Sequence, residues 1–148
     1  MMELDGKGIS IKPIGSEIGR ASALKICSAS LTKGTLTLHT AIMIAADAMG
    51  LTDEFHQELL IGRETLYRQI ESGTRRLPSV AGRYIGEMEE ITAAFSAVGV
   101  TPKFYEGVLE VYRLLAETPL ASETPDTIDA GRTLNEAAKL FAKYLPMR

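Results

Sequence analysis

The chain has 148 residues, 45% of them hydrophobic and 24% charged, and its formal net charge is −3. This composition is typical of a globular domain that is large enough to bury a core. The slightly acidic balance excludes any electrostatic reason to expect nucleic acid or an anionic membrane as a partner.

The N-terminal segment predicts one short strand. Residues 8–14 alternate apolar and polar side chains, and Pro13 limits such a strand to an edge or an end of a sheet. We interpret residues 1–14 as a linker, or as the tail of a Rossmann domain that is otherwise missing.

A long helix is expected over residues 16–49, a range that contains no proline. Ser16 is a suitable N-cap and Gly50 a suitable residue directly after the C-terminus. Gly34 predicts a kink or a short break, because an interior glycine costs about 1 kcal/mol relative to alanine. The range is apolar on nearly every face, which is typical of a central helix covered from several sides.

Shorter helices follow. We expect them over residues 52–61, 63–71, 79–99, 102–117 and 126–144, with a basic loop at 74–78 and a polar loop at 118–125. The absence of tryptophan and an aromatic content of 6% also favour helices over a β-sandwich.

The expected fold class is therefore all-α, with about six helices around one long central N-terminal helix. Residues 15–148 are interpreted as a single helical substrate and dimerisation domain. The first helix is too long and too apolar for a compact domain of this size, so we expect it to be covered by a second copy, in a homodimer, or by another domain.

The sequence lacks both a possible intramolecular disulfide and a long apolar run, and these two features suggest a cellular compartment. Cys27 is the only cysteine, which excludes an intramolecular disulfide, and as a buried thiol it would fit a reducing compartment. No apolar run has the length of a signal peptide or a membrane span. The expected location is cytoplasmic.

Lys25 is the main candidate for chemistry. On a helix its neighbours one turn away are Ala21, Ser22, Ser28 and Ala29, all of them small. Such surroundings allow a recessed, partly dry site, which favours the neutral amine that proton transfer requires. The alternative, which spacing alone favours, is a lysine that extends its stem and keeps its charge in water.

Two motifs resemble a known family. Gly15-xxx-Gly19 followed by Lys25, and the later run Arg83-Tyr-Ile-Gly-Glu87-Met-Glu-Glu-Ile91, are similar to segments of the β-hydroxyacid dehydrogenase and 6-phosphogluconate dehydrogenase superfamily. The resemblance covers about residues 6–117. It is closest to a branch of phosphogluconate dehydrogenase, NAD-binding, C-terminal domains.

The resemblance implies a reaction class. Members transfer a hydride between NAD(P) and a β-hydroxyacid, and the matching lysine, here Lys25, moves the hydroxyl proton. The substrate would be a small hydroxyacid or a phosphorylated one. NAD or NADP would sit in a Rossmann domain, in cis or in trans, because this chain has no dinucleotide fingerprint and is expected to bind neither cofactor alone.

This chain departs from the family at two positions. Many members have asparagine four residues after the lysine, where this chain has Ala29, and Ser28 is the nearest polar substitute. Many also have Lys-Asp-Leu where this chain has Gly86-Glu87-Met88, so a second cation is missing. Glu87 matches an acidic family position and is expected to pair internally.

Further substrate contacts are predicted from polar side chains around Lys25 and from an arginine cluster. Ser22 and Ser28 flank the lysine, while Arg76 and Arg83, together with Arg75, could clamp a carboxylate or phosphate through paired hydrogen bonds. The alternative for the arginines is a solvated loop and helix surface. His39 and His56 lack ligand spacing, so no metal site is expected.

Two hypotheses follow for function. The first is the substrate-side domain of an NAD(P)-dependent hydroxyacid oxidoreductase with Lys25 as general acid/base. The second is a non-catalytic helical dimerisation or regulatory module derived from such an enzyme.

Overall fold

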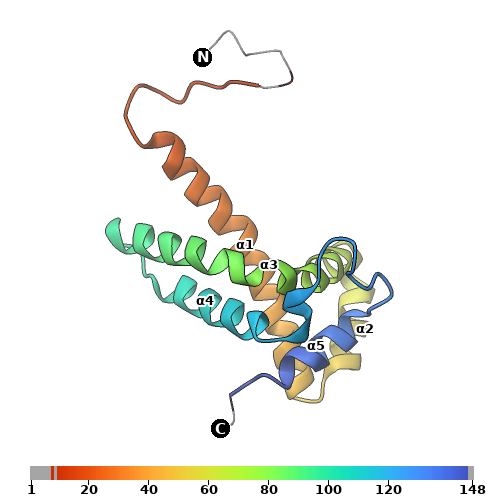
Figure 1. The fold of residues 1–148 in the computed structure, drawn as a ribbon. Coiled ribbons are helices and arrows are strands. Elements are labelled where there is room, and N and C mark those ends of the chain that lie inside the picture. The colour runs from red at the N-terminus through yellow and green to blue at the C-terminus, as the bar shows by residue number, and fades with distance from the viewer. Residues whose placement is uncertain (1–7, 9, 147–148) are drawn as a thin grey trace.

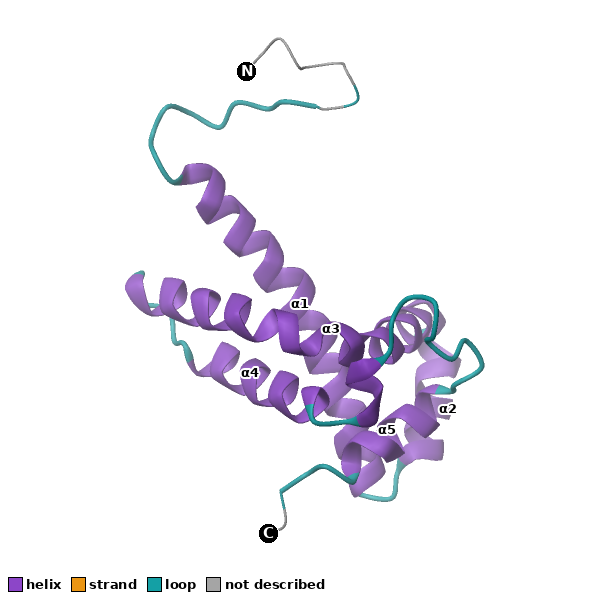
Figure 2. Cartoon of the chain, viewed as in Figure 1, coloured by secondary structure: helices purple, strands orange, loops and turns teal. Residues whose placement is uncertain are grey.

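A computed structural model describes residue 8 and residues 10–146. Five α-helices and one 3-10 turn make up the regular structure of this part of the chain. Figure 1 shows how the labelled helices are arranged, and Figure 2 shows the loops that join them. The all-α prediction is confirmed. The structure has five α-helices where about six were expected, because the helices expected over 63–71 and 79–99 form one continuous helix.

The first helix, α1, spans Arg20–Ala48 without interruption. Its N-cap is Gly19, in a left-handed conformation with φ 93° and no side-chain cap, so the prediction of Ser16 as the cap is wrong. Gly50 follows the C-terminus with φ 71°, as expected. The predicted break at Gly34 is also wrong. A Cβ there would lie 3.2 Å from Tyr105 Cε1, so this glycine admits the tyrosine ring of a neighbouring helix.

The predicted strand over residues 8–14 is wrong for the residues described in that range, which have no regular secondary structure. A strand is stabilised by hydrogen bonds to a second strand, and no strand occurs in the described part of the chain. The alternation of apolar and polar residues was therefore not sufficient to form a strand.

Helices α2 (Thr52–Gly62) and α3 (Glu64–Ala97) meet at Arg63. Helix α3 runs through the predicted loop at 74–78, with Pro78 in its interior. An interior proline costs about 3 kcal/mol through a lost hydrogen bond and a steric clash. Pro78 is fully buried and its neighbour Leu77 is 1% exposed. Burial of this turn offsets the cost, which local sequence signals did not reveal.

Helix α4 (Lys103–Ala116) begins after Pro102, as expected, and is followed by the 3-10 turn η2 (Pro119–Ser122). The last helix, α5 (Leu134–Ala142), begins eight residues later than predicted, at 134 rather than 126. Thr133 and Glu136 form a capping box that fixes this start. The Thr-x-x-Glu pattern is readable in the sequence and would have given the correct boundary.

The core consists of two clusters. In the larger one α3 and α4 pack together, with contributions from α1 and α5, and its largest fully buried side chains are Tyr112, Phe141, Leu77, Met88 and Leu115. The smaller one joins α1, α2, α3 and α5 through Met43, Leu59, Tyr67, Ile70, Leu134 and Ala138.

Helix α1 is only partly covered by the other helices. Its N-terminal turns extend beyond the bundle (Figure 1), and the first buried residue along it is Ser30. Four large apolar side chains on α1 are exposed, at spacings that place them along one side of the helix. We call Leu24 (56% exposed), Leu31 (73%), Leu38 (46%) and Ile42 (41%) the α1 stripe.

Among the described residues, no helix combines the length and the apolar character needed to cross a bilayer.

The crossing of α1 and α3 contains one buried polar contact that can be tested. Thr40 Oγ1 donates to the Leu36 carbonyl, and Thr74 Oγ1 lies 3.2 Å from Thr40 Oγ1; both threonines are fully buried. Since the Thr40 proton is used, Thr74 is the donor in this contact. Thr40→Val would leave the Thr74 hydroxyl buried without this acceptor, a loss of about 1–3 kcal/mol.

We expect Thr74→Val to cost less than Thr40→Val, because Thr40 keeps its bond to the backbone. The double variant should be more stable than Thr40→Val alone. Urea denaturation followed by circular dichroism measures these differences. Equal losses in both single variants, adding up in the double variant, would contradict the assignment of donor and acceptor.

Candidate functional site

A small pocket lies between the N-terminal half of α1 and the C-terminal half of α3. Its volume is about 180 Å³, and the residues that line it are Ser22, Lys25, Ile26, Ala29, Glu87, Glu90 and Ile91. Lys25, the residue that the sequence singled out, is therefore part of a concavity between two helices.

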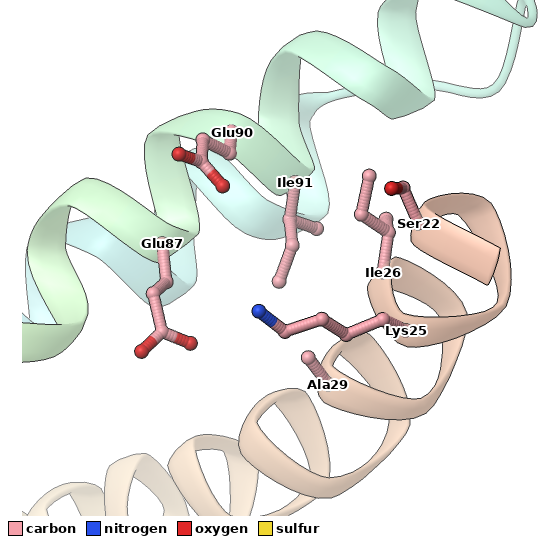
Figure 3. Close-up of a pocket in the computed structure, with 7 residues that line it drawn as sticks. All are labelled: Ser22, Lys25, Ile26, Ala29, Glu87, Glu90 and Ile91. Atoms are coloured by element: carbon pink, nitrogen blue, oxygen red, sulfur yellow. The ribbon is translucent and has the colours of Figure 1, made fainter. Parts of the chain in front are cut away.

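The Lys25 side chain extends from α1 toward α3, and its amine points at the space between Glu87 and Ile91 (Figure 3). Ile91 is 2% exposed, while Ile26 and Ala29 are partly buried, so the walls beside the lysine stem are apolar. Lys25 itself is exposed and forms no ion pair with a described residue. The site is shallow and open on one side.

Glu87 pairs with a lysine that the sequence analysis did not consider. Lys33 Nζ donates to Glu87 Oε2 across the α1–α3 interface, so the internal pairing expected for Glu87 is present. Lys33 lies eight residues after Lys25 on the same side of α1, and its side chain is 16% exposed. Its i, i+8 spacing from Lys25 was the only feature of the sequence that could have indicated a role for Lys33 near the pocket.

Lys33 also lies over an aromatic ring. Its Nζ is 4.1 Å from the ring centroid of Tyr84, a favourable cation–π contact. Burial lowers the pKa of Lys33 from its ordinary value. Tyr84 opposes that change, and the positive charges of Arg83 and Lys25 add to it. The positive charge of Lys25 thus contributes to the lowered pKa of Lys33.

The serines predicted to flank Lys25 have different positions. Ser22 lines the pocket. Ser28 is exposed and outside the pocket lining, and its backbone carbonyl accepts a hydrogen bond from Thr32 Oγ1. The structure brings only Ser22 together with Lys25.

The three arginines of the proposed anion clamp do not converge. Arg75 donates to the carbonyls of Ala130 and Arg132, so it anchors the loop before α5. Arg75 and Arg76 line the same hollow next to that loop, and Arg83 is not part of its lining. Arg83 lies over Tyr84, 4.9 Å from the ring centroid, and donates to its hydroxyl.

The cysteine is not where the sequence analysis placed it. Cys27 was expected to be a buried thiol, but it is exposed on the part of α1 that the bundle leaves uncovered. It was misjudged because apolar neighbours on the sequence do not show which face of a helix is covered.

The two histidines have ordinary surroundings. His39 is partly buried, which lowers its pKa, and the His56 ring stacks on Tyr67 with 4.5 Å between centroids. In the described part of the chain, no group of three or more histidine, cysteine, aspartate or glutamate side chains has the geometry of a metal site.

The described residues do not fit a dinucleotide cofactor. Its pyrophosphate is held by a glycine-rich turn between a strand and a helix, and no strand precedes α1 in the described residues. Gly15 and Gly19 do have positive φ angles, 106° and 93°, but they follow irregular chain.

Comparison with known proteins gives one match. The family model described as "Domain of unknown function (DUF1932)" matches residues 46–115, a range that includes Glu87 and Glu90 but not Lys25. This helical domain is associated with 6-phosphogluconate and hydroxyacid dehydrogenase-like proteins. No curated protein and no solved structure matches the chain.

Proposed function

We propose that this chain is the substrate-side helical domain of an NAD(P)-dependent β-hydroxyacid oxidoreductase, in which Lys25 is the general acid/base. The observation that carries the proposal is the placement of Lys25. Its amine points into a pocket between α1 and α3 and has no ion-pair partner among the described residues. The match to a dehydrogenase-associated domain supports the same reading.

The role of Lys25 is to move one proton at the substrate oxygen. During oxidation the neutral amine accepts the hydroxyl proton, and during reduction the ammonium returns it to the carbonyl oxygen. Ile26 and Ile91 line the pocket beside the amine, so the carbon atoms of a small substrate would meet an apolar wall there. Ser22 adds a hydroxyl that can hydrogen-bond the substrate.

The substrate class is the one that the family resemblance implies, a small hydroxyacid or a phosphorylated one. A volume of about 180 Å³ suits a small molecule. Arg83 lies over the same Tyr84 ring as Lys33 and is the better candidate for a carboxylate contact than Arg76, which lines another hollow. The hydride donor or acceptor, NAD or NADP, would be held by a Rossmann domain in cis or in trans.

We expect Lys25→Met to lower kcat for oxidation of short 3-hydroxycarboxylates by about 10²–10⁴, the usual contribution of a general acid/base. The assay uses the chain joined to, or mixed with, a Rossmann domain. Lys103→Met at the start of α4 is the matched control, because Lys103 is exposed and is not one of the pocket-lining residues. Unchanged kcat in Lys25→Met would overturn the proposal.

The alternative function, a non-catalytic dimerisation or regulatory module, is favoured by the α1 stripe. Leu24, Leu31, Leu38 and Ile42 expose large apolar side chains along one helix, and Cys27 is exposed on the same helix. Exposed apolar surface of this kind is typical of an interaction site. We propose that a second copy of the chain covers it, a proposal compatible with either function.

We expect the chain to be a dimer at micromolar concentration in light scattering, and Leu31→Glu to make it monomeric, since a charge buried at an interface is costly. Leu31 is 73% exposed in one copy, so the change should not unfold it. Val98→Glu, at an equally exposed apolar residue (76%) after α3, is the control and should remain dimeric. A monomeric wild-type chain would contradict the proposal.

A further inference from the structure

The Lys25 pocket places an amine and two carboxylates close together. Two carboxylates, Glu87 and Glu90, line the same small pocket as the Lys25 amine. A carboxylate that pairs with an ammonium favours the charged form of the amine and opposes loss of its proton. A lysine that exchanges protons with a substrate must be kept out of such a pair.

Glu90 and Glu87 differ in how they are held. Glu90 is exposed and is therefore solvated, with its charge screened by water. Glu87 is only partly exposed and points into the α1–α3 interface, where its carboxylate accepts from Lys33. Glu87 is thus the carboxylate whose position depends on a partner.

Lys33 is fixed more firmly than a surface lysine. Its side chain is 16% exposed, and its Nζ lies over the Tyr84 ring. Tyr84 is in turn held by an edge contact with Tyr112, whose ring centroid is 5.8 Å away and which is fully buried. The position of the Lys33 ammonium is therefore set by the core of the bundle.

We propose that Lys33 is a positioning residue for Lys25: by pairing with Glu87 over the Tyr84 ring, it keeps the Glu87 carboxylate from capturing the Lys25 amine. This inference rests on the proposed function for its catalytic meaning. The arrangement itself concerns only two lysines and one carboxylate, so it can be measured without turnover.

The two lysines also interact directly through their charges. The positive charge of Lys25 contributes to lowering the pKa of Lys33, together with burial and with the charge of Arg83. Electrostatic coupling between two sites is reciprocal. We therefore expect removal of Lys33 to affect Lys25 both through the lost charge and by releasing Glu87.

The test measures the chemical reactivity of Lys25 in the 148-residue chain. Competitive acylation with acetic anhydride, followed by peptide mass spectrometry, reports how readily each lysine reacts as the neutral amine. In Lys33→Met we expect Lys25 to react about threefold to tenfold more slowly, because one pKa unit corresponds to a tenfold change in the equilibrium. Lys33→Arg, which keeps the charge, should stay within about twofold of wild type.

Rescue by a second substitution separates the proposal from a merely structural role. Lys33→Met/Glu87→Gln removes the released carboxylate and should restore Lys25 reactivity to within about twofold of wild type. Lys33→Met/Glu90→Gln, which removes the other pocket carboxylate, should not. Arg113→Met is the control for a lost ion pair on α3, since Arg113 pairs with Glu89 at 3.4 Å outside the pocket lining, and should leave Lys25 unchanged.

Unchanged Lys25 reactivity in Lys33→Met, or failure of Glu87→Gln to restore it, would overturn the proposal. If Lys33→Met does not fold, as judged by circular dichroism, Lys33→Gln replaces it in both arms. Failure of the proposed function has a different signature, because turnover would then survive Lys25→Met whatever the acylation experiment shows.

Discussion

The close crossing of α1 over α3 is the constraint on which the rest of the structure depends. Gly73 of α3 lies where an added Cβ would overlap the Leu36 side chain of α1. The buried hydroxyls of Thr40 and Thr74 meet at the same crossing. Because these contacts fix the two helices, the α1 residues before them face the C-terminal half of α3.

Because of that placement, residues of both helices line the pocket. Lys25 and Ser22 come from α1, whereas Glu87, Glu90 and Ile91 come from α3. A shift of one helix along the other would separate the amine from its apolar wall and from the carboxylates. Lys25 is exposed beside two carboxylates, and one of them, Glu87, is already paired with Lys33.

Predictions from the sequence were best where local signals agreed with packing. The start of α4 after Pro102 and the glycine after α1 followed from backbone preferences alone. The same reasoning failed at Pro78, because burial of that turn outweighed its helix-breaking tendency. It failed for Cys27, since the sequence does not show which face of α1 the bundle covers.

The sequence by itself determined the all-α class and the long first helix, because helix periodicity is a local property. Lys25 was singled out by the resemblance of its segment to a known family, since spacing alone favoured a solvated lysine. Only the tertiary structure decided that Ser22 shares a pocket with Lys25 and that Arg76 does not line it. It also decided that Lys33 pairs with Glu87. Contacts between residues on different helices depend on how those helices cross, which packing of the whole core sets.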